Sequence, residues 1–400
     1  MIGALLLIIC LFLINQTLFG LYSKRHNWFS KKLMNSLYFY HLVFFVVYYV
    51  YALNNPSDSW SYYNSPLESN NLWFDFFMPG TTFIDFLSFP FVKYLNFNYE
   101  MMMVLYSWMG YLGFLFSYLF FRENIPVKVK VFKQIDLLIL TLFLPNMHFW
   151  TSSLGKGAPI FMGLMMFAYS IKQPQSRILT LIIGIIFIYF IRPHVFLFVA
   201  AGTVLGFMSG KEKISFWKKV LIYTGMIGGL YLVQDDILGV AGLDNSTDVI
   251  GDFQDFSNKR SADLSEFADS AVSMSSYPLP IKLFTFWFRP LFFDAPGVLG
   301  LIVSAENLVY LLLFFKILNK RFFKFLKKAP VSVKMSLTVF FLTSFAMTFV
   351  MSNLGIIMRQ KSMVMYFLFF TIYYFLAQEK YDKIIAIRRQ RKQMKIPSTI

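Results

Sequence analysis

Long apolar runs alternate with short polar connections along almost the whole chain. The first run covers residues 2–22, and the second is centred near residue 43. Each has the length of about 20 residues that a helix needs to cross the apolar core of a bilayer. By this measure the pattern predicts about eleven membrane spans, centred near residues 12, 43, 111, 142, 165, 184, 201, 228, 308, 342 and 370. We therefore expect an all-α integral membrane protein, with residues 1–400 forming a single polytopic domain.

Composition favours a membrane protein over a soluble domain. Hydrophobic residues make up 57% of the chain and charged residues only 14%, and the mean hydropathy is +0.56. The single cysteine, Cys10, lies inside the first apolar run, which excludes an internal disulfide and a cysteine-based metal site. Because no basic residue precedes this run and Lys24 and Arg25 follow it, we interpret it as a retained helix and not as a cleaved signal peptide.

Basic residues are concentrated in every second connection between the predicted spans. Most of the 37 Lys and Arg residues lie within residues 24–32, 122–133, 172–177, 211–219, 316–334 and 380–395. The positive-inside rule assigns these segments to the cytoplasm, so we expect the N-terminus outside, the C-terminus inside and a basic cytoplasmic tail over residues 379–400. The net charge of +16 is then a property of the inner face, which favours contact with anionic membrane lipids and argues against nucleic acid as a partner.

Two long loops fall on the opposite, external side. The first, residues 54–100, carries aspartates and prolines within apolar stretches, so we expect interfacial or re-entrant helices there and no further span. The second, residues 235–296, begins with a polar portion and ends with an aromatic approach to Arg289 and Asp294. Neither loop has the size of a soluble domain, and any chemistry is therefore expected at the membrane surface.

Five cations lie on the predicted external side, where the positive-inside rule gives no reason for a basic residue. Each is within a few residues of a predicted span or in the tight turn between the fourth and fifth spans; they are Arg192, Arg289, Arg359, Lys361 and Lys156. An isolated arginine near a helix end commonly reaches the lipid headgroups, but several on the side where basic residues are scarce indicate a shared anionic ligand. Because arginine offers permanently charged, bidentate contacts to phosphate oxygens, we expect these cations to bind the diphosphate of a lipid carrier.

Four further residues are candidates for acid–base chemistry or substrate binding. His194 follows Arg192 closely and His148 lies in "LPNMHFWTSS"; imidazole titrates near neutral pH, although a lone histidine at an interface is more often a packing residue. Asp58 begins "DSWSYY", where a turn role is the alternative, and Glu306 is a carboxylate within the ninth span that needs a cationic partner. The sequence contains no glycine-rich phosphate loop, zinc-binding pattern or nucleophile elbow, so we expect no cofactor and no metal.

Several short motifs carry a resemblance to a known family. They are, in chain order, "DSWSYY", "GTTFIDFLSFPF", "LPNMHFWTSSLGKGAPIF", "IRPH", "FRPLFFDAPG" followed by "SAENL", and "NLGIIMRQK". Together they resemble the Wzy-type and EpsG-like polymerases of bacterial surface polysaccharides (O-antigen and exopolysaccharide), and the resemblance covers most of the chain. It implies a helical bundle like that of the polytopic C-type (GT-C) glycosyltransferases. The chain departs from the pattern in two places: Lys361 stands where a second arginine is expected, and Gly157 follows Lys156 where an acidic residue is common.

The resemblance implies glycosyl transfer between two undecaprenyl-diphosphate-linked glycans at the external face of the cytoplasmic (inner) membrane. Chain-length regulators or export proteins would be further partners. The reducing end of the growing chain would leave its carrier and join a sugar hydroxyl of the incoming repeat unit. Family arginines hold the diphosphate, so Arg192, Arg359 and Lys361 are expected to stabilise charge on the leaving group. His194 or, failing it, Asp58 is expected to deprotonate the acceptor hydroxyl.

Two alternatives remain open. A C-type glycosyltransferase would use a prenyl-monophosphate sugar donor and would depend on an aspartate in the first external loop, which makes Asp58 indispensable. A flippase for lipid-linked oligosaccharides would need charge in a cavity reachable from both faces, and flippases usually show an internal repeat. The sequence shows no internal repeat and its unexplained cations lie on one face, which favours an enzyme.

Overall fold

Nearly all of the described chain is helical. The computed structural model describes residues 1–125, 127–211, 277–295, 297–351 and 353–394, together with scattered positions between 217 and 274. Five described helices are long and apolar enough to cross a membrane: α1 (Ile2–Arg25), α2 (Lys31–Asn54), α5 (Tyr99–Asn124), α14 (Gly297–Phe315) and α16 (Val331–Val350). The expectation of an all-α, multi-pass membrane protein is confirmed, whereas the number of spans stays a prediction.

Several shorter helices complete the bundle, and one of them lies in its interior. α8 (Gly157–Ser170) is buried along nearly its whole length between α5 and α9 (Ile178–Ile191), and α10 (Pro193–Ser209) packs on α16. Because protein encloses α8, this helix need not match the bilayer thickness. The fourth predicted span consists of two helices, α6 (Leu137–Leu142) and α7 (Pro145–Thr151). Pro145 cannot donate a backbone N–H to the preceding turn, and it therefore begins a new helix.

Residues 54–100 form short helices that cap one end of the bundle. They are α3 (Asp58–Glu68), a 3-10 turn (Trp73–Phe76), α4 (Thr82–Phe89) and a π-helical turn (Pro90–Tyr94), and none of them is long enough to cross a membrane. The rings of Phe83 and Phe190 stack with their centroids 4.8 Å apart, and the amide of Gly80 donates to the carbonyl of Phe190 at 2.7 Å. These contacts attach α4 and the loop before it to the end of α9.

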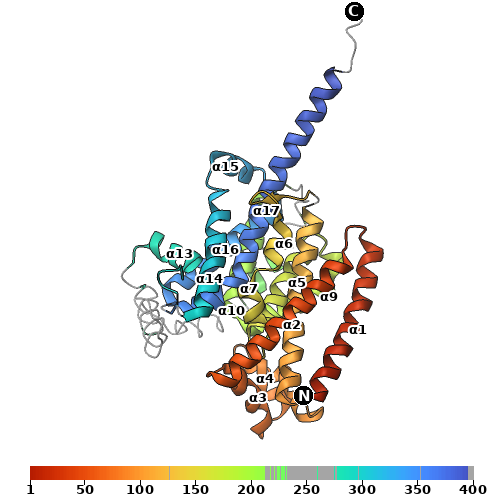
Figure 1. Ribbon diagram of the computed structural model, residues 1–400, viewed down its shortest axis with the longest axis vertical. Coiled ribbons are helices and arrows are strands. Elements are labelled where there is room, and N and C mark those ends of the chain that lie inside the picture. The colour runs from red at the N-terminus through yellow and green to blue at the C-terminus, as the bar shows by residue number, and fades with distance from the viewer. Residues whose placement is uncertain are drawn as a thin grey trace, which may run out of the picture.

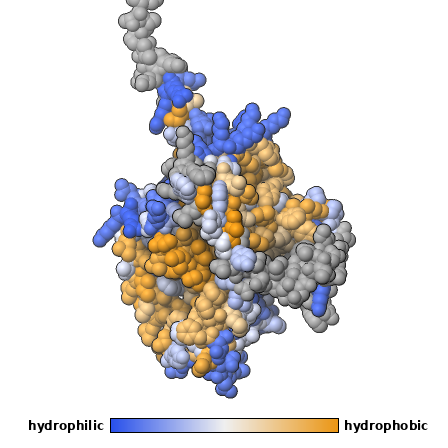
Figure 2. Space-filling view, turned by 180° about the vertical axis from the view of Figure 1, so that it is seen from behind, coloured by the Kyte–Doolittle hydropathy of each residue, from blue (hydrophilic) through white to orange (hydrophobic). Residues whose placement is uncertain are grey.

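The two ends of the bundle carry different segments. α3 and α4 lie at one end, here called the α3 end, whereas α15 (Lys320–Lys327) and the C-terminal part of α17 (Leu354–Met394) lie at the other (Figure 1). The basic connections meet at this second end, here called the basic end. Nζ of Lys380 donates to the carbonyl of Lys128 at 2.7 Å, and Nζ of Lys172 donates to the carbonyl of Glu123 at 2.8 Å. Figure 2 shows a hydrophobic band between the two hydrophilic ends. The compartment that each end faces stays a prediction.

The remaining elements are few. A hairpin of β1 (Lys130–Val131) and β2 (Ile135–Asp136) follows α5, with Lys130 paired to Asp136. α13 (Leu279–Phe288) packs on α14 and α16. The basic tail predicted over residues 379–400 continues α17 as far as Met394. The span predicted near residue 228 and most of the second external loop, residues 235–296, lie outside the described residues.

A close crossing of α5 and α7 depends on Gly110. A Cβ atom on Gly110 would lie 2.0 Å from the carbonyl oxygen of Thr151, so a side chain there would force two buried backbones apart. We expect Gly110→Ala to lower the free energy of unfolding by roughly 1–3 kcal/mol, seen as a lower midpoint of thermal unfolding in detergent. Gly20→Ala in α1 is the matched control, because a Cβ atom there meets nothing within 4 Å. Equal midpoints for the two variants would contradict the close crossing.

Candidate functional site

An ion pair joins the first external helix to the last long helix. Nη1 of Arg359, near the start of α17, lies 3.0 Å from Oδ2 of Asp58. Asp58 is the first residue of α3, where the Ser57 hydroxyl caps the helix and where a carboxylate is electrostatically favoured. The guanidinium group of Arg359 also lies 5.9 Å from the centre of the Trp150 ring, which stabilises the cation. Two segments that are remote in the chain therefore hold Arg359 at the α3 end.

Arg192 occupies the sharp turn between α9 and α10. Pro193 begins α10, and the extended conformation that a residue before proline prefers ends α9 at Ile191. Arg192 is only 7% exposed, and its Nη1 donates to Oε1 of Gln360, the neighbour of Arg359 on α17. Its Nε has no hydrogen-bond partner in the described part of the chain. A buried guanidinium group with an unused donor is a place where a bound anion gains hydrogen bonds.

The Tyr62 hydroxyl marks where the charged groups converge. Tyr62 lies one turn after Asp58 on α3, and burial raises its pKa; the charge of Asp58 raises that pKa further. The positive charges of Arg359 and Arg192 both lower it. All three charged side chains are therefore close enough to act on one hydroxyl group. Gly155, between α7 and α8, lies against the same ring, since a Cβ atom on Gly155 would be 3.4 Å from it. We call Asp58, Tyr62, Arg192 and Arg359 the arginine site.

Lys156 and His194 flank the arginine site. Nζ of Lys156 donates to Oγ1 of Thr81 at 2.7 Å, in the first external loop. His194 is the second residue of α10 and is partly exposed, and the charges of Arg192 and Lys156 both act on its ring. The structure therefore brings three of the predicted phosphate-binding cations to the α3 end, close to the predicted bases Asp58 and His194.

A second polar cluster is enclosed by α7, α14 and α17. Its members, here called the polar core, are Asn146, Glu306, Asn307, Tyr310 and Lys361. Nζ of Lys361 donates to Oδ1 of Asn307 at 2.6 Å and to the backbone carbonyl of Arg289 at 2.7 Å. Glu306 accepts hydrogen bonds from the Tyr310 hydroxyl and, at 2.7 Å, from the backbone N–H of Asn146. The first turn of α7 thus supplies a donor to a buried carboxylate.

The polar core supports the arginine site from within the bundle. Nδ2 of Asn146 donates to the carbonyl of Met358 at 2.9 Å, and Lys361, three positions later, donates to Asn307, so both contacts hold the turn of α17 that carries Arg359. Lys361 is fully buried and Glu306 is 3% exposed. Phosphate binding by Lys361 and catalysis by Glu306 stay predictions; both need contact with a substrate, and protein encloses both groups in this structure. Their hydrogen bonds join α7, α14 and α17 directly below the arginine site.

Two other predicted residues have their polar atoms engaged elsewhere. Nε of Arg289 lies 2.5 Å from Oδ2 of Asp294, so this guanidinium group closes a local turn after α13. His148 is fully buried; its Nδ1 lies 2.9 Å from Nδ1 of His41, and its Nε2 lies 2.8 Å from the carbonyl of Leu142. Both ring nitrogens of His148 are therefore used inside the bundle, which is the packing role that an isolated histidine more often has.

The structure adds one candidate that the sequence did not single out. Asp85 on α4 is buried, and its Oδ2 accepts a hydrogen bond from Ser65 of α3 at 2.9 Å. Its Oδ1 has no partner among the described residues. Burial raises the pKa of Asp85 to about 6, although the Ser65 hydrogen bond and the Lys156 charge act in the opposite direction. Asp85 is therefore a further candidate proton acceptor near neutral pH. Its sequence signal is a lone aspartate within the apolar stretch "TTFIDFLSF".

Neither a metal site among the described residues nor a similar known protein indicates which reaction the protein catalyses. In the residues that the structure describes, no group of three or more His, Cys, Asp and Glu side chains is placed to hold a metal ion. No known protein family, curated protein or solved structure matches the chain. The assignment of a function therefore rests on the arginine site and on the motifs around it.

Proposed function

We propose that the protein polymerises lipid-linked oligosaccharide repeat units, as the resemblance to Wzy-type and EpsG-like polymerases implies. The glycan would pass from one undecaprenyl-diphosphate carrier to a sugar hydroxyl on another. The observation that carries the proposal is that Arg192, in the α9–α10 turn, and Arg359, on α17, lie close together. The buried Nε donor of Arg192 has no partner among the described residues. A diphosphate offers the charge and the oxygen geometry that two guanidinium groups recognise.

The orientation belongs to the same proposal. The chain would cross the cytoplasmic membrane about eleven times, in a bundle of the C-type glycosyltransferase kind, with the N-terminus and the arginine site outside. The basic connections that meet at the opposite end support this orientation, because basic segments are retained in the cytoplasm. The substrate carrier would then reach the arginine site from the outer leaflet.

The reaction forms one glycosidic bond and breaks one bond to phosphate. The acceptor hydroxyl gives its proton to a base, its oxygen attacks the anomeric carbon of the donor, and the electron pair of the broken bond stays on the diphosphate. Arg192 and Arg359 stabilise the charge that develops there. In the structure Asp58 forms an ion pair with Arg359. A diphosphate that binds this guanidinium group would displace the Asp58 carboxylate, which could then accept the proton of the acceptor hydroxyl. Asp58, His194 and Asp85 are the candidate bases.

The exposure of Asp58 favours one alternative reaction. Its side chain is 66% exposed even though Arg359 binds it. A C-type glycosyltransferase that adds a single sugar from a prenyl-monophosphate donor would use an accessible aspartate of this kind as its base. In that reaction Asp58 would be essential, whereas the second arginine would matter less, because a monophosphate carries less charge.

The test is the composition of lipid-linked glycans in the native host. We expect deletion of the gene to accumulate a complete single repeat unit on its carrier at the external face, and re-expression of the wild type to restore polymer, as measured by mass spectrometry. Accumulation of a unit that lacks one sugar would identify the single-sugar transferase instead. Complete units trapped on the cytoplasmic face would identify a flippase and would refute the polymerase proposal.

A further inference from the structure

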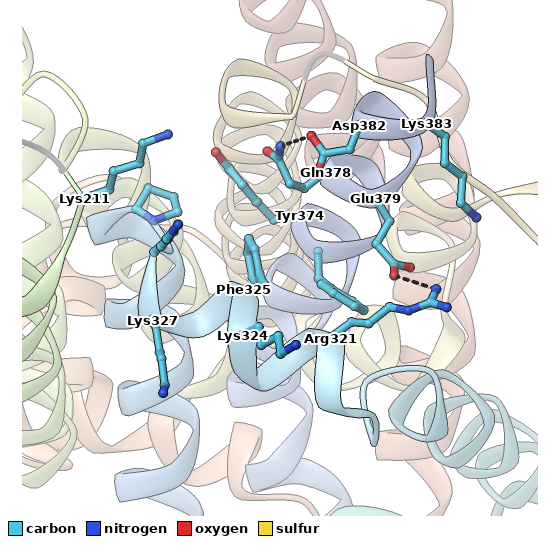
Figure 3. A pocket seen from close by; sticks show the side chains of 13 residues that line it. Lys211, Arg321, Lys324, Phe325, Lys327, Tyr374, Gln378, Glu379, Asp382 and Lys383 are labelled. Carbon is cyan, nitrogen blue, oxygen red and sulfur yellow. Dashed lines mark hydrogen bonds and ion pairs between the residues drawn. The ribbon is translucent and has the colours of Figure 1, made fainter. Parts of the chain in front are cut away.

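We infer that the basic end holds a binding site for the headgroup of an anionic membrane phospholipid. The site is a cavity of about 690 Å³ between α15 and α17 (Figure 3). Six basic side chains line it: Lys211, Arg321, Lys324, Lys327, Lys328 and Lys383. Only two acidic side chains, Glu379 and Asp382, accompany them. The cavity lies at the end opposite the arginine site, so the inference does not depend on the proposed glycosyl transfer.

The two carboxylates do not neutralise the cavity. Nη1 of Arg321 reaches from α15 to Oε1 of Glu379 on α17 at 3.4 Å, and Asp382 accepts a hydrogen bond from Gln378 at 2.9 Å (Figure 3). Within the described chain, the ammonium groups of Lys324 and Lys383 form no hydrogen bond or ion pair. Uncompensated ammonium groups on two walls of one cavity favour an anion, and phosphate accepts such hydrogen bonds strongly.

The structure of α15 favours a lipid over a soluble phosphate compound. Phe322 and Phe325 attach α15 to α17, with ring centroids 5.2 Å from Phe375 and 6.0 Å from Tyr374, respectively. Phe323, which lies between these two residues in the sequence and directly before Lys324, is 60% exposed. A short basic helix with exposed aromatic surface is typical of the layer between lipid headgroups and acyl chains. A phospholipid can place its phosphate in the cavity and its chains along this apolar surface, which a soluble phosphate compound would leave uncovered.

The test measures which lipids the purified full-length protein retains in detergent. Native mass spectrometry would count bound phosphatidylglycerol and phosphatidylcholine after incubation with an equal mixture. We expect the wild type to retain phosphatidylglycerol preferentially and Lys324→Gln/Lys383→Gln to weaken that preference by roughly fivefold for each charge removed. The matched control is Lys31→Gln/Lys32→Gln, which removes the same charge from exposed residues at the start of α2, at the same end, and should keep the preference.

Two results would overturn the inference. Equal losses in both double variants would mean that the basic end attracts anionic lipid through its net charge alone, without a site. Displacement of the bound lipid by millimolar glycerol phosphate would mean that the cavity takes a soluble phosphate compound. If the double variant cannot be purified, Lys324→Gln alone still tests the site, with an expected loss of about fivefold.

Discussion

Replacing Arg192 with alanine is expected to slow the proposed glycan polymerisation by about 100-fold to 1,000-fold, the loss observed when a preorganised donor to a developing negative charge is removed. Arg192 is buried, and its Nε has no partner in the described chain, so no neighbour replaces the lost donor. Arg192→Lys keeps the charge but loses the planar, bidentate geometry, and we expect an intermediate rate. The measurement is polymer length together with the amount of single repeat units left on the carrier, in cells with equal expression.

Lys93→Ala is the matched control for Arg192→Ala. Lys93 belongs to the π-helical turn at the same end, and no ion pair involves it among the described residues. This variant should polymerise like the wild type. Wild-type polymerisation by a folded Arg192→Ala protein would show that the diphosphate is held elsewhere. Arg192→Ala also removes the hydrogen-bond partner of Gln360. The midpoints of thermal unfolding of Arg192→Ala and the wild type must therefore be compared before their activities are compared.

Lys361→Met is expected to lower the free energy of unfolding by about 3–5 kcal/mol, the effect of removing one member from a buried group of charged and hydrogen-bonded side chains. Lys361 is fully buried, donates to Asn307, and lies close enough to Glu306 for their charges to attract. Methionine has a similar length, but it leaves the carboxylate without a counter-charge and the amide of Asn307 without its donor. The midpoint of thermal unfolding in detergent should fall accordingly.

A second substitution tests the origin of that loss. Glu306→Gln added to Lys361→Met should recover part of the stability, because an amide still bonds to Tyr310 and Asn146 but carries no charge to compensate. Strictly additive losses in the double variant would refute charge coupling within the polar core. Polymerisation by the single variant should also fall, since Lys361 fixes the turn that carries Arg359.

Arg192 shows what a single membrane-protein sequence makes visible. A guanidinium group inside an apolar run is costly in a bilayer, and the following proline signals a break in the helix, so two independent effects point to the same position. Its partner could not be found in this way. Gln360 is 168 positions away, and only tertiary packing brings the two side chains together.

Lys361 shows why the sequence alone does not give the direction in which a polar side chain points from its helix. A lysine that faces a binding site and one that faces the protein interior interrupt an apolar run in the same manner. Helical residues two positions apart point about 200° apart, so Arg359 reaches α3 whereas Lys361 reaches α14. The hydrophobic pattern places a residue along the axis of its helix. Which neighbouring helix its side chain faces depends on how the helices pack.

α17 runs for 41 residues from Leu354 to Met394, a length of about 60 Å. After Gly355 it contains no glycine or proline, the residues at which helices usually kink. One end of this helix carries Arg359, and the other projects from the bundle beyond the basic end (Figure 1). A pull of one helical turn on the projecting end would separate Arg359 from Asp58 by about 5 Å. A single unbroken helix therefore joins the α3 end of the bundle to the basic end.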